Sequence, residues 1–207
     1  MKKIVIQWLG HSCFKLTFGE YTAVVDPYEN GSVPGLSNLN VSAIDVFCSH
    51  KHHDHCAMNV VKQIRMFAPP PLITRVESFH DDEEGAKRGE NTIQVFSYEG
   101  LSVAHFGDLG HLLTQEQVEK IGQVDVALLP VGGFYTMDGK TALQVAKQVG
   151  AKVIIPMHYR TEDYGFDVIN TLKSFTDLCE NVTYYHTDTI EITRDTKAQV
   201  AVLKYMG

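Results

Sequence analysis

The sequence contains no hydrophobic run of the length that crosses a membrane, which is about 20 residues for a helix. Two lysines followed by apolar residues open the chain, as in a secretory signal, but Gln7 interrupts this short run. Gly10 and His11 then follow without a small-residue cleavage site. We therefore expect a first β-strand here, a cytoplasmic location and no membrane association.

An excess of positive charge is also missing. The 207 residues include 25 acidic and 18 basic side chains, which gives a formal net charge of −7. Nucleic-acid-binding surfaces are normally basic, so we expect a small-molecule substrate and no nucleic-acid partner. Nothing in the sequence decides between a monomer and a homo-oligomer.

Motifs of several other classes of enzyme are absent. The chain has no G-x-S-x-G nucleophile elbow, and the glycines at Gly132 and Gly133 lack the spacing of a P-loop. No two cysteines form a C-x-x-C pair. We expect all of them to be reduced thiols that pack as small hydrophobic side chains: Cys13, Cys48, Cys56 and Cys179.

The chain does have the apolar content that a sizeable core needs, since 44% of its residues are hydrophobic. Its length suits a single domain over residues 1–207. Runs of β-branched and aromatic residues predict strands at Ile4–Leu9, Cys13–Phe18, Thr22–Asp26, Ile44–Ser49, Leu72–Thr74, Thr92–Ser97, Leu101–Phe106, Asp125–Val131, Lys152–Met157, Thr183–Tyr185, Thr189–Ile192 and Val200–Tyr205. Apolar periodicity and capping residues predict helices at Ala57–Phe67, Thr114–Ile121, Lys140–Val149 and Asp167–Leu178.

This order of elements predicts a mixed fold of the α+β or α/β class. It fits two sheets packed face to face with helices outside them, a four-layer αββα sandwich. The short turn at Gly19 and Glu20 predicts antiparallel pairing of the early strands. The pattern alone does not distinguish this sandwich from a three-layer α/β fold, but the motif described next does.

The most informative stretch of the chain is Ser49–His55. It contains the pattern H-x-H-x-D-H, made by His50, His52, Asp54 and His55. Neutral imidazole together with carboxylate suits zinc, manganese or iron. The motif therefore predicts a metal centre, and His53, at an x position, is expected to point away from it.

Other polar residues stand where predicted strands end. They are Asp26, His105, Asp108 and His158. Active sites of sheet-based folds collect at strand ends, where loops present side chains from a rigid frame. We therefore expect these residues and the His-rich motif to meet in one cleft.

Together these motifs resemble those of the metallo-β-lactamase-fold hydrolases. Within them the chain is similar to the branch that includes L-ascorbate-6-phosphate lactonase-like and related metal-dependent hydrolases. The anchors of the resemblance lie at residues 10–14, 25–27, 50–55, 106–108, 129–133 and 155–159. The resemblance implies the αββα sandwich and a hydrolase that uses a hydroxide shared by two divalent metal ions.

The resemblance also implies a ligand set. It assigns the first ion to His50 and His52, the second ion to Asp54, His55 and His158, and a bridging position to Asp108. Asp54, Asp108 and His158 are the implied catalytic residues. Zinc is the first expectation for both ions, and manganese or iron are the alternatives.

The first site needs a third imidazole, for which His80 and His105 are the candidates. In the family this ligand lies well upstream of the bridging aspartate, as His80 does. His105 precedes Asp108 by only three residues on the same predicted strand. We therefore favour His80 as the ligand and expect His105 to support the site from behind.

Asp26 matches an early aspartate of the family that supports the site without binding metal, although it would also suit a plain turn before Pro27. Tyr135 and Tyr159 are candidates for substrate contact. Arg160 would suit an anionic substrate if it faced the cleft, but a solvated position is the more common case for such a residue. We expect His11 either near the cleft or in the scaffold, and favour the scaffold.

These residues predict a dinuclear hydrolase acting on a small ester, lactone or phosphoester. One alternative is a nuclease or phosphodiesterase of the same fold, which the short and acidic chain disfavours. The other is a metal-binding regulatory module without catalysis, which the full ligand set disfavours. The substrate depends on loops such as Pro27–Ser42, and the sequence does not name it.

Overall fold

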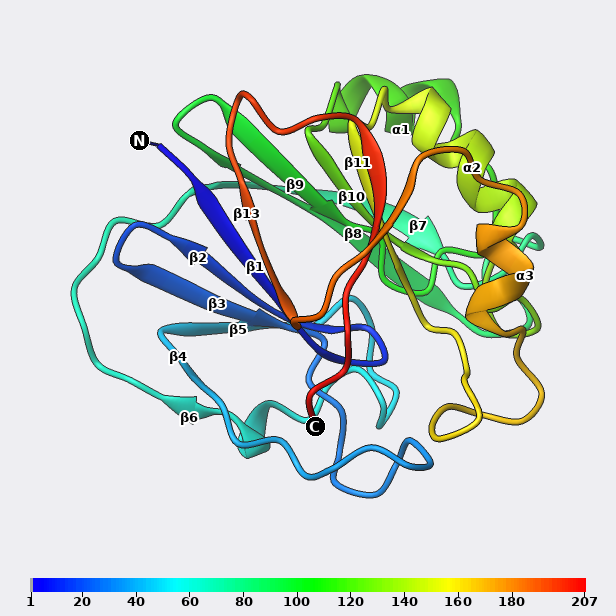
Figure 1. Cartoon of the computed structure of the whole chain (residues 1–207), viewed down its shortest axis with the longest axis horizontal. Coiled ribbons are helices and arrows are strands. Elements are labelled where there is room, and N and C mark those ends of the chain that lie inside the picture. The colour runs from blue at the N-terminus through cyan, green and yellow to red at the C-terminus, as the bar shows by residue number, and fades with distance from the viewer. Residues whose placement is uncertain (1) are drawn as a thin grey trace.

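The computed structural model describes residues 2–207 and shows two β-sheets packed face to face (Figure 1). The first sheet has the strand order β13-β1-β2-β3-β5, with β1 (Ile4–Gly10), β2 (Cys13–Phe18), β3 (Tyr21–Val25), β5 (Asp45–Phe47) and β13 (Thr189–Ile192). The second has the order β12-β14-β11-β10-β9-β8-β7, with β7 (Leu72–Phe79), β8 (Glu90–Tyr98), β9 (Leu101–His105), β10 (Val126–Pro130), β11 (Val153–Met157), β12 (Val182–Tyr184) and β14 (Gln199–Val202).

The burial pattern of the strands explains why these segments pair. Along β1 the buried residues Ile4, Ile6 and Trp8 alternate with partly exposed ones, as expected of a strand with one face on the core. The pairing of β1, β2 and β3 is antiparallel, which confirms the predicted meander. All five residues of β10 are buried, because this strand lies between parallel neighbours and is covered on both faces.

The main hydrophobic core lies between the two sheets. The rings of Phe18 on β2 and Phe96 on β8 stack with their centroids 5.8 Å apart. Phe47 on β5 meets Phe96 edge to face at 5.4 Å. Aromatic pairs of this kind stabilise a core beyond the area they bury, so these contacts join the sheets.

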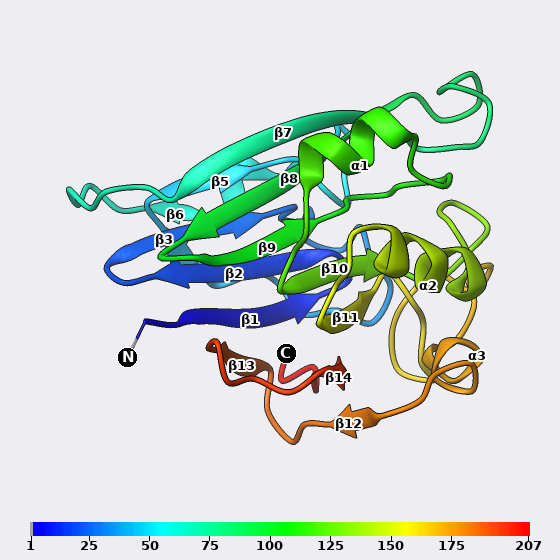
Figure 2. The same cartoon turned by 90° about the horizontal axis from the view of Figure 1, so that it is seen from above.

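Helices cover the outer face of the second sheet only. They are α1 (Gln115–Ile121), which packs against β7, α2 (Gly139–Gln148), which packs against β10, and α3 (Leu172–Thr176), which lies beside α2 (Figures 1 and 2). Thr114 caps α1 as predicted, because its hydroxyl accepts from Gln117 N and Gln117 Oε1 accepts from Thr114 N. No helix within residues 2–207 is both long and apolar enough to cross a membrane.

The outer side of the first sheet is covered without an α-helix, so the prediction of a helix over Ala57–Phe67 is wrong. The segment contains one 3₁₀ turn, η1 (Met58–Val60), and the short strand β6 (Lys62–Gln63), which pairs with β4 (Ser42–Ala43). Its backbone N–H groups bond to Val41 and Ala43 across the loop. Phe67 is 97% exposed, so the apolar spacing there does not mark a buried helix face.

Two other elements differ most in length from the prediction. The helix predicted over Asp167–Leu178 is restricted to α3. Strand β7 continues past the predicted end at Thr74 and pairs with β8 at every residue up to Phe79. This extension places His80 at the end of a strand, beside the ends of β9 and β11.

Cys48 and Cys56 form a disulfide, so the prediction that all cysteines are reduced is wrong for this pair. The two residues flank the segment Ser49–His55 on either side. This segment folds back on itself and brings their Cα atoms to 5.2 Å, within the range that a disulfide spans. Cys13 and Cys179 are free thiols.

We expect the double substitution Cys48→Ser and Cys56→Ser to lower the free energy of unfolding by about 2–3 kcal/mol, because a cross-link of this short loop restricts the unfolded chain. Chemical denaturation of the metal-free protein measures the change. Cys179→Ser is the matched control and should have little effect, since its thiol only donates to the Phe175 carbonyl at 3.2 Å. A reductant should destabilise the wild type but not the double variant; equal responses would show that the bond does not stabilise the protein.

Candidate metal centre

Six elements bring polar side chains to one end of the sandwich. His11 lies in the turn between β1 and β2, Asp26 directly follows β3, and the segment His50–His55 follows β5. Three residues of the second sheet meet them there, at the ends of β7, β9 and β11: His80, Asp108 and His158. The structure thus brings these side chains together at the strand ends, within contact of one another.

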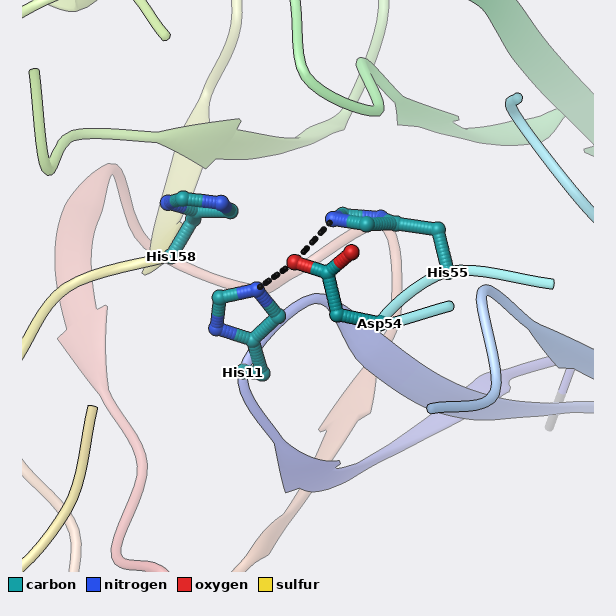
Figure 3. A group of neighbouring side chains, drawn as sticks. All are labelled: His11, Asp54, His55 and His158. Carbon is teal, nitrogen blue, oxygen red and sulfur yellow. Dashed lines mark hydrogen bonds and ion pairs between the residues drawn. The ribbon is translucent and has the colours of Figure 1, made fainter. Parts of the chain in front are cut away.

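Three groups of side chains have ligand atoms within 4.8 Å of one another, and two of them share no residue. The first group consists of His50, His52 and His80, and the second of His11, Asp54, His55 and His158. Figure 3 shows the second group, in which Asp54 points between His11 and His55. Its Oδ2 lies 3.3 Å from His11 Nε2 and 3.6 Å from His55 Nε2. A third set, Asp26 with His50 and His55, also meets this distance, but the Asp26 oxygens already accept hydrogen bonds.

Asp108 stands between the two groups. Its Oδ2 lies 3.0 Å from His80 Nε2 and 3.2 Å from both His55 Nε2 and His158 Nε2. Burial alone would raise the pKa of this carboxyl, but the adjoining His158 and His55 outweigh burial and hold it well below its ordinary value. Asp108 is therefore an ionised carboxylate that both groups share.

One buried carboxylate fixes the direction of two imidazoles from the motif. His55 Nδ1 donates to Asp26 Oδ2 at 2.9 Å, and Ser49 Oγ donates to the same oxygen at 2.5 Å. Because the Ser49 hydrogen is used in this way, Ser49 Oγ accepts from His50 Nδ1 at 2.9 Å. Both rings thus present Nε2 to the centre, which is how a supporting carboxylate orients metal-binding imidazoles.

The structure distinguishes His80 from His105. His80 Nδ1 donates to the carbonyl oxygen of Tyr135 at 3.0 Å, which leaves Nε2 free toward Asp108. His105 is fully buried and uses both nitrogens in the scaffold: Nε2 donates to Ser12 O at 2.8 Å, and Nδ1 accepts from Gly107 N at 3.1 Å. The geometry therefore groups His80, and not His105, with His50 and His52.

The donor set fits divalent metal ions. Nε2 of His50, Nε2 of His55 and Oδ1 of Asp108 are buried and have no hydrogen-bond partner among the described residues. In neutral His55 and His80, Nε2 carries a lone pair, which would face the Asp108 carboxylate at 3.0–3.2 Å. Buried polar atoms rarely stay unpaired in this way, and a cation between these nitrogens and oxygens would satisfy all of them.

The electrostatics of the donor set differ from one imidazole to the next. Burial, with a further contribution from His55, lowers the pKa of His50 to about 3. Burial and the neighbouring His158 lower the pKa of His11 to about 4. For His55, burial acts in the same direction, but Asp108 and Asp26 outweigh it and raise the pKa well above its ordinary value. Neutral imidazole is the form that binds metal, so His50 is ready to bind and protons compete at His55.

Three residues of the site adopt a strained backbone. His11, Asp26 and His158 have φ values of 50°, 51° and 53°, in the left-handed region that non-glycine residues rarely adopt. Gly132 packs against His158 so closely that a Cβ there would collide with the His158 carbonyl oxygen. Strain of this kind collects at functional sites, where the surrounding structure holds it in place.

A cavity of about 310 Å³ opens onto the two groups. Tyr135, a candidate for substrate contact, lines it together with Phe166, and the two ring centroids lie 6.0 Å apart. Tyr159 does not line it: this side chain is buried against Trp8, because the chain turns at His158 and directs the next residue into the core. Arg160 donates from Nε to the Ile169 carbonyl and also does not line the cavity.

Two residues have a larger part in the site than the sequence indicated. His11, for which the scaffold was favoured, is 2% exposed and contacts Asp54. Ser49 received no role of its own, although a hydroxyl directly before the first ligand of the motif is the signal that could have indicated one. His53 points away as predicted, with 88% of its side chain exposed.

Comparison with known proteins places this geometry in a family. Residues 5–158 match the model of the Beta-lactamase superfamily domain. A UPF0173 metal-dependent hydrolase of Methanoculleus marisnigri is 30% identical over 188 residues, which cover 75% of this chain and 81% of that one. The chain belongs to the metallo-β-lactamase superfamily and its UPF0173 metal-dependent hydrolase family. It is thus a metal-dependent hydrolase.

Further relatives support the same family. The UPF0173 metal-dependent hydrolase TV0864 of Thermoplasma volcanium is 28% identical over 204 residues, covering 80% of this chain and 86% of that one. Among solved structures, a protein of Thermotoga maritima assigned to the Zn-dependent hydrolases of the metallo-beta-lactamase superfamily is 37% identical. It covers 97% of this chain and 98% of its own, with a TM-score of 0.77. The predicted fold class is confirmed.

Proposed function

We propose that this metallo-β-lactamase-fold hydrolase holds two divalent ions and acts on a small ester, lactone or phosphoester. The position of Asp108 carries the proposal, because its Oδ2 lies 3.0 Å from His80 in the first group and 3.2 Å from His158 in the second. A carboxylate shared by two sets of ligands suits ions about 3.5–4 Å apart. The motif resemblance to the L-ascorbate-6-phosphate lactonase-like branch adds support.

In this proposal His50, His52 and His80 hold the first ion, and Asp54, His55 and His158 hold the second, with Asp108 between them. Zinc is the first expectation for both, and manganese or iron are alternatives. His11, whose Nε2 lies 3.3 Å from Asp54 Oδ2, is the fourth member of the second group.

Two ions bound there would lower the pKa of a shared water to about 7 and polarise the bond under attack. The chain's own residues provide orientation. Asp26 and Ser49 hold the imidazoles of His50 and His55 in one tautomer, and the aromatic rings of Tyr135 and Phe166 line the cavity. Protonation of the leaving group would fall to Asp108 or to a neighbouring imidazole.

The test combines metal content with a hydrolysis screen. Metal-loaded wild type should hold about two equivalents of metal per chain and hydrolyse a member of a panel of lactones, phosphodiesters and thioesters. His52→Ala and His80→Ala should lose metal and activity. His53→Ala, which removes the adjacent but exposed imidazole, should lose neither.

Less than one equivalent in the wild type, or activity that survives a chelator unchanged, would contradict the proposal. Hydrolysis of polynucleotides alone would favour the nuclease alternative. Two bound ions without any hydrolysis would favour the regulatory module.

A cytoplasmic location is part of the proposal, and the cysteines test it. Disulfides are rare in the cytoplasm, so a bond between Cys48 and Cys56 in the native compartment would contradict this location. Alkylation of thiols in intact cells, followed by mass spectrometry of the segment between them, would show whether the bond forms in the native compartment.

A further inference from the structure

Two basic side chains line the cavity together with the metal-ligand candidates. Arg88 and Lys87 both line the cavity, together with Tyr135 and Phe166. They come from the loop that joins β7 to β8, directly after His80. Because the other charged groups facing the cavity are carboxylates and imidazoles, these two side chains determine how it receives an anion.

The two cations differ in what already neutralises them. Lys87 Nζ lies 2.6 Å from Glu83 Oε1 and 3.8 Å from Asp82 Oδ1, so acidic neighbours on its own loop satisfy its charge. The Arg88 guanidinium has no ion pair or hydrogen bond with any residue in the described range 2–207, although it is partly buried. Arg88 therefore carries the uncompensated positive charge of this cavity.

Aromatic rings orient the Arg88 guanidinium. Its Cζ lies 5.8 Å from the ring centroid of Tyr135 and 6.0 Å from that of Phe134. An arginine over an aromatic face keeps its hydrogen-bond donors free at the rim of its plane, where they match the oxygens of a carboxylate or phosphate. The side chain is thus held in place without using its donors.

Hydrogen bonds within the loop that joins β7 to β8 hold the backbone at Arg88 in place. The Asp81 carboxylate accepts from the backbone N–H groups of four residues at 2.7–3.0 Å: Glu83, Gly85, Lys87 and Arg88. His80 N also donates to Gly89 O at 3.0 Å, which closes the loop at its base. The segment after His80 is therefore a frame that fixes Arg88 relative to the centre.

We propose that Arg88 binds an anionic group of the substrate, a phosphate or a carboxylate remote from the bond that is cleaved. The proposal rests on the proposed function for the position of that bond. The rings of Tyr135 and Phe166 would contact the part of the substrate that lies between its anionic group and the bond that is cleaved. A cavity of about 310 Å³ is at the small end of ligand sites, so the substrate is a small molecule that carries its own negative charge.

Binding of non-hydrolysable probes to metal-loaded protein tests this assignment apart from catalysis. The probes are phenylphosphonate, benzoate and the neutral benzamide, measured by calorimetry with wild type, Arg88→Gln, Arg88→Lys and Lys87→Gln. Any anion affinity that comes from the metals is common to all four proteins. A charged hydrogen bond of this kind is worth at least about tenfold in Kd.

We expect Arg88→Gln to weaken an anionic probe at least about tenfold, Arg88→Lys to restore part of the loss, and Lys87→Gln and benzamide binding to change little. A loss for phenylphosphonate alone identifies a phosphate group, and a loss for benzoate alone identifies a carboxylate. Equal affinity of wild type and Arg88→Gln for both anions would overturn the proposal. Thermal unfolding of each variant checks that it is folded. Failure of the hydrolysis screen would leave this result unaffected, so the two proposals fail separately.

Discussion

Asp108→Asn should reduce kcat/KM for any substrate found in the screen by at least about a thousandfold and should leave the protein with fewer than two metal ions. The carboxylate is buried, and its Oδ2 faces the Nε2 atoms of His55, His80 and His158 at 3.0–3.2 Å. An amide keeps the shape but removes the negative charge that both groups share. Metal analysis and steady-state kinetics on the same preparations measure the two effects.

The matched control is Asp138→Asn. Asp138 caps α2 by accepting from Thr141 N at 2.8 Å, and asparagine caps a helix as well as aspartate does. This variant should keep wild-type activity and metal content. If Asp108→Asn retained both ions and a rate within about tenfold of the wild type, the shared carboxylate would not be the centre of the site.

Asp26→Asn should weaken metal binding by about 10–100-fold although Asp26 touches no metal in the proposal. The variant should also lower the free energy of unfolding of the metal-free protein by about 3–5 kcal/mol, because it breaks a buried charged network. Asp26 is fully buried and accepts from Ser49 N, Ser49 Oγ and His55 Nδ1, so the amide leaves donors without an acceptor. Metal titration and denaturant unfolding measure the two quantities.

The difference in free energy of unfolding between wild type and Asp26→Asn should become smaller as the pH falls. Burial raises the pKa of Asp26, but His105 and His55 outweigh burial and hold it below its ordinary value of 3.8. A lowered folded pKa means that the carboxylate stabilises the fold above the unfolded value, and that this contribution is lost as the pH falls through the folded pKa. The difference should therefore be full at pH 7 and should shrink in acid.

Asp45→Asn is the control for this effect. Asp45 lies on the neighbouring strand and accepts from Tyr21 Oη at 2.6 Å, which an amide oxygen also accepts. Its stability and metal affinity should stay close to those of the wild type. If Asp26→Asn lowered the free energy of unfolding and the metal affinity no more than Asp45→Asn does, Asp26 would be only the turn residue before Pro27 that the sequence also allowed.

The sequence pattern predicted strands correctly where the burial of side chains alternates from residue to residue or is continuous along the segment. The alternation in Ile4–Leu9 and the continuous apolar run in Asp125–Val131 identify β1 and β10, because one strand faces the core on one side and the other on both. The same reasoning failed over Ala57–Phe67. There the backbone pairs with β4, and an exposed Phe67 imitates the spacing of a helix.

Through-space relations were harder to derive. The sequence did not show that Cys48 and Cys56 meet, because their separation matches no redox or metal motif and only the folded-back segment brings them together. Tyr159 follows a site residue yet lies in the core, since the positive φ of His158 redirects the chain. Arg88 lines the cavity although no motif marks it in the sequence, whereas Arg160, which lies close to His158 in the sequence, does not line it.

The sequence by itself determined that this chain carries a metal-type motif, His50–His55, at the end of a strand, because ligand spacing within one short segment is a local property. It also indicated which strands would deliver Asp108 and His158. Only the tertiary structure decided that His80 and not His105 joins the first group, because that depends on the full length of β7 and on the hydrogen bonds that occupy both His105 nitrogens. Contacts between segments far apart in sequence depend on strand length, register and packing, and these are properties of the whole fold.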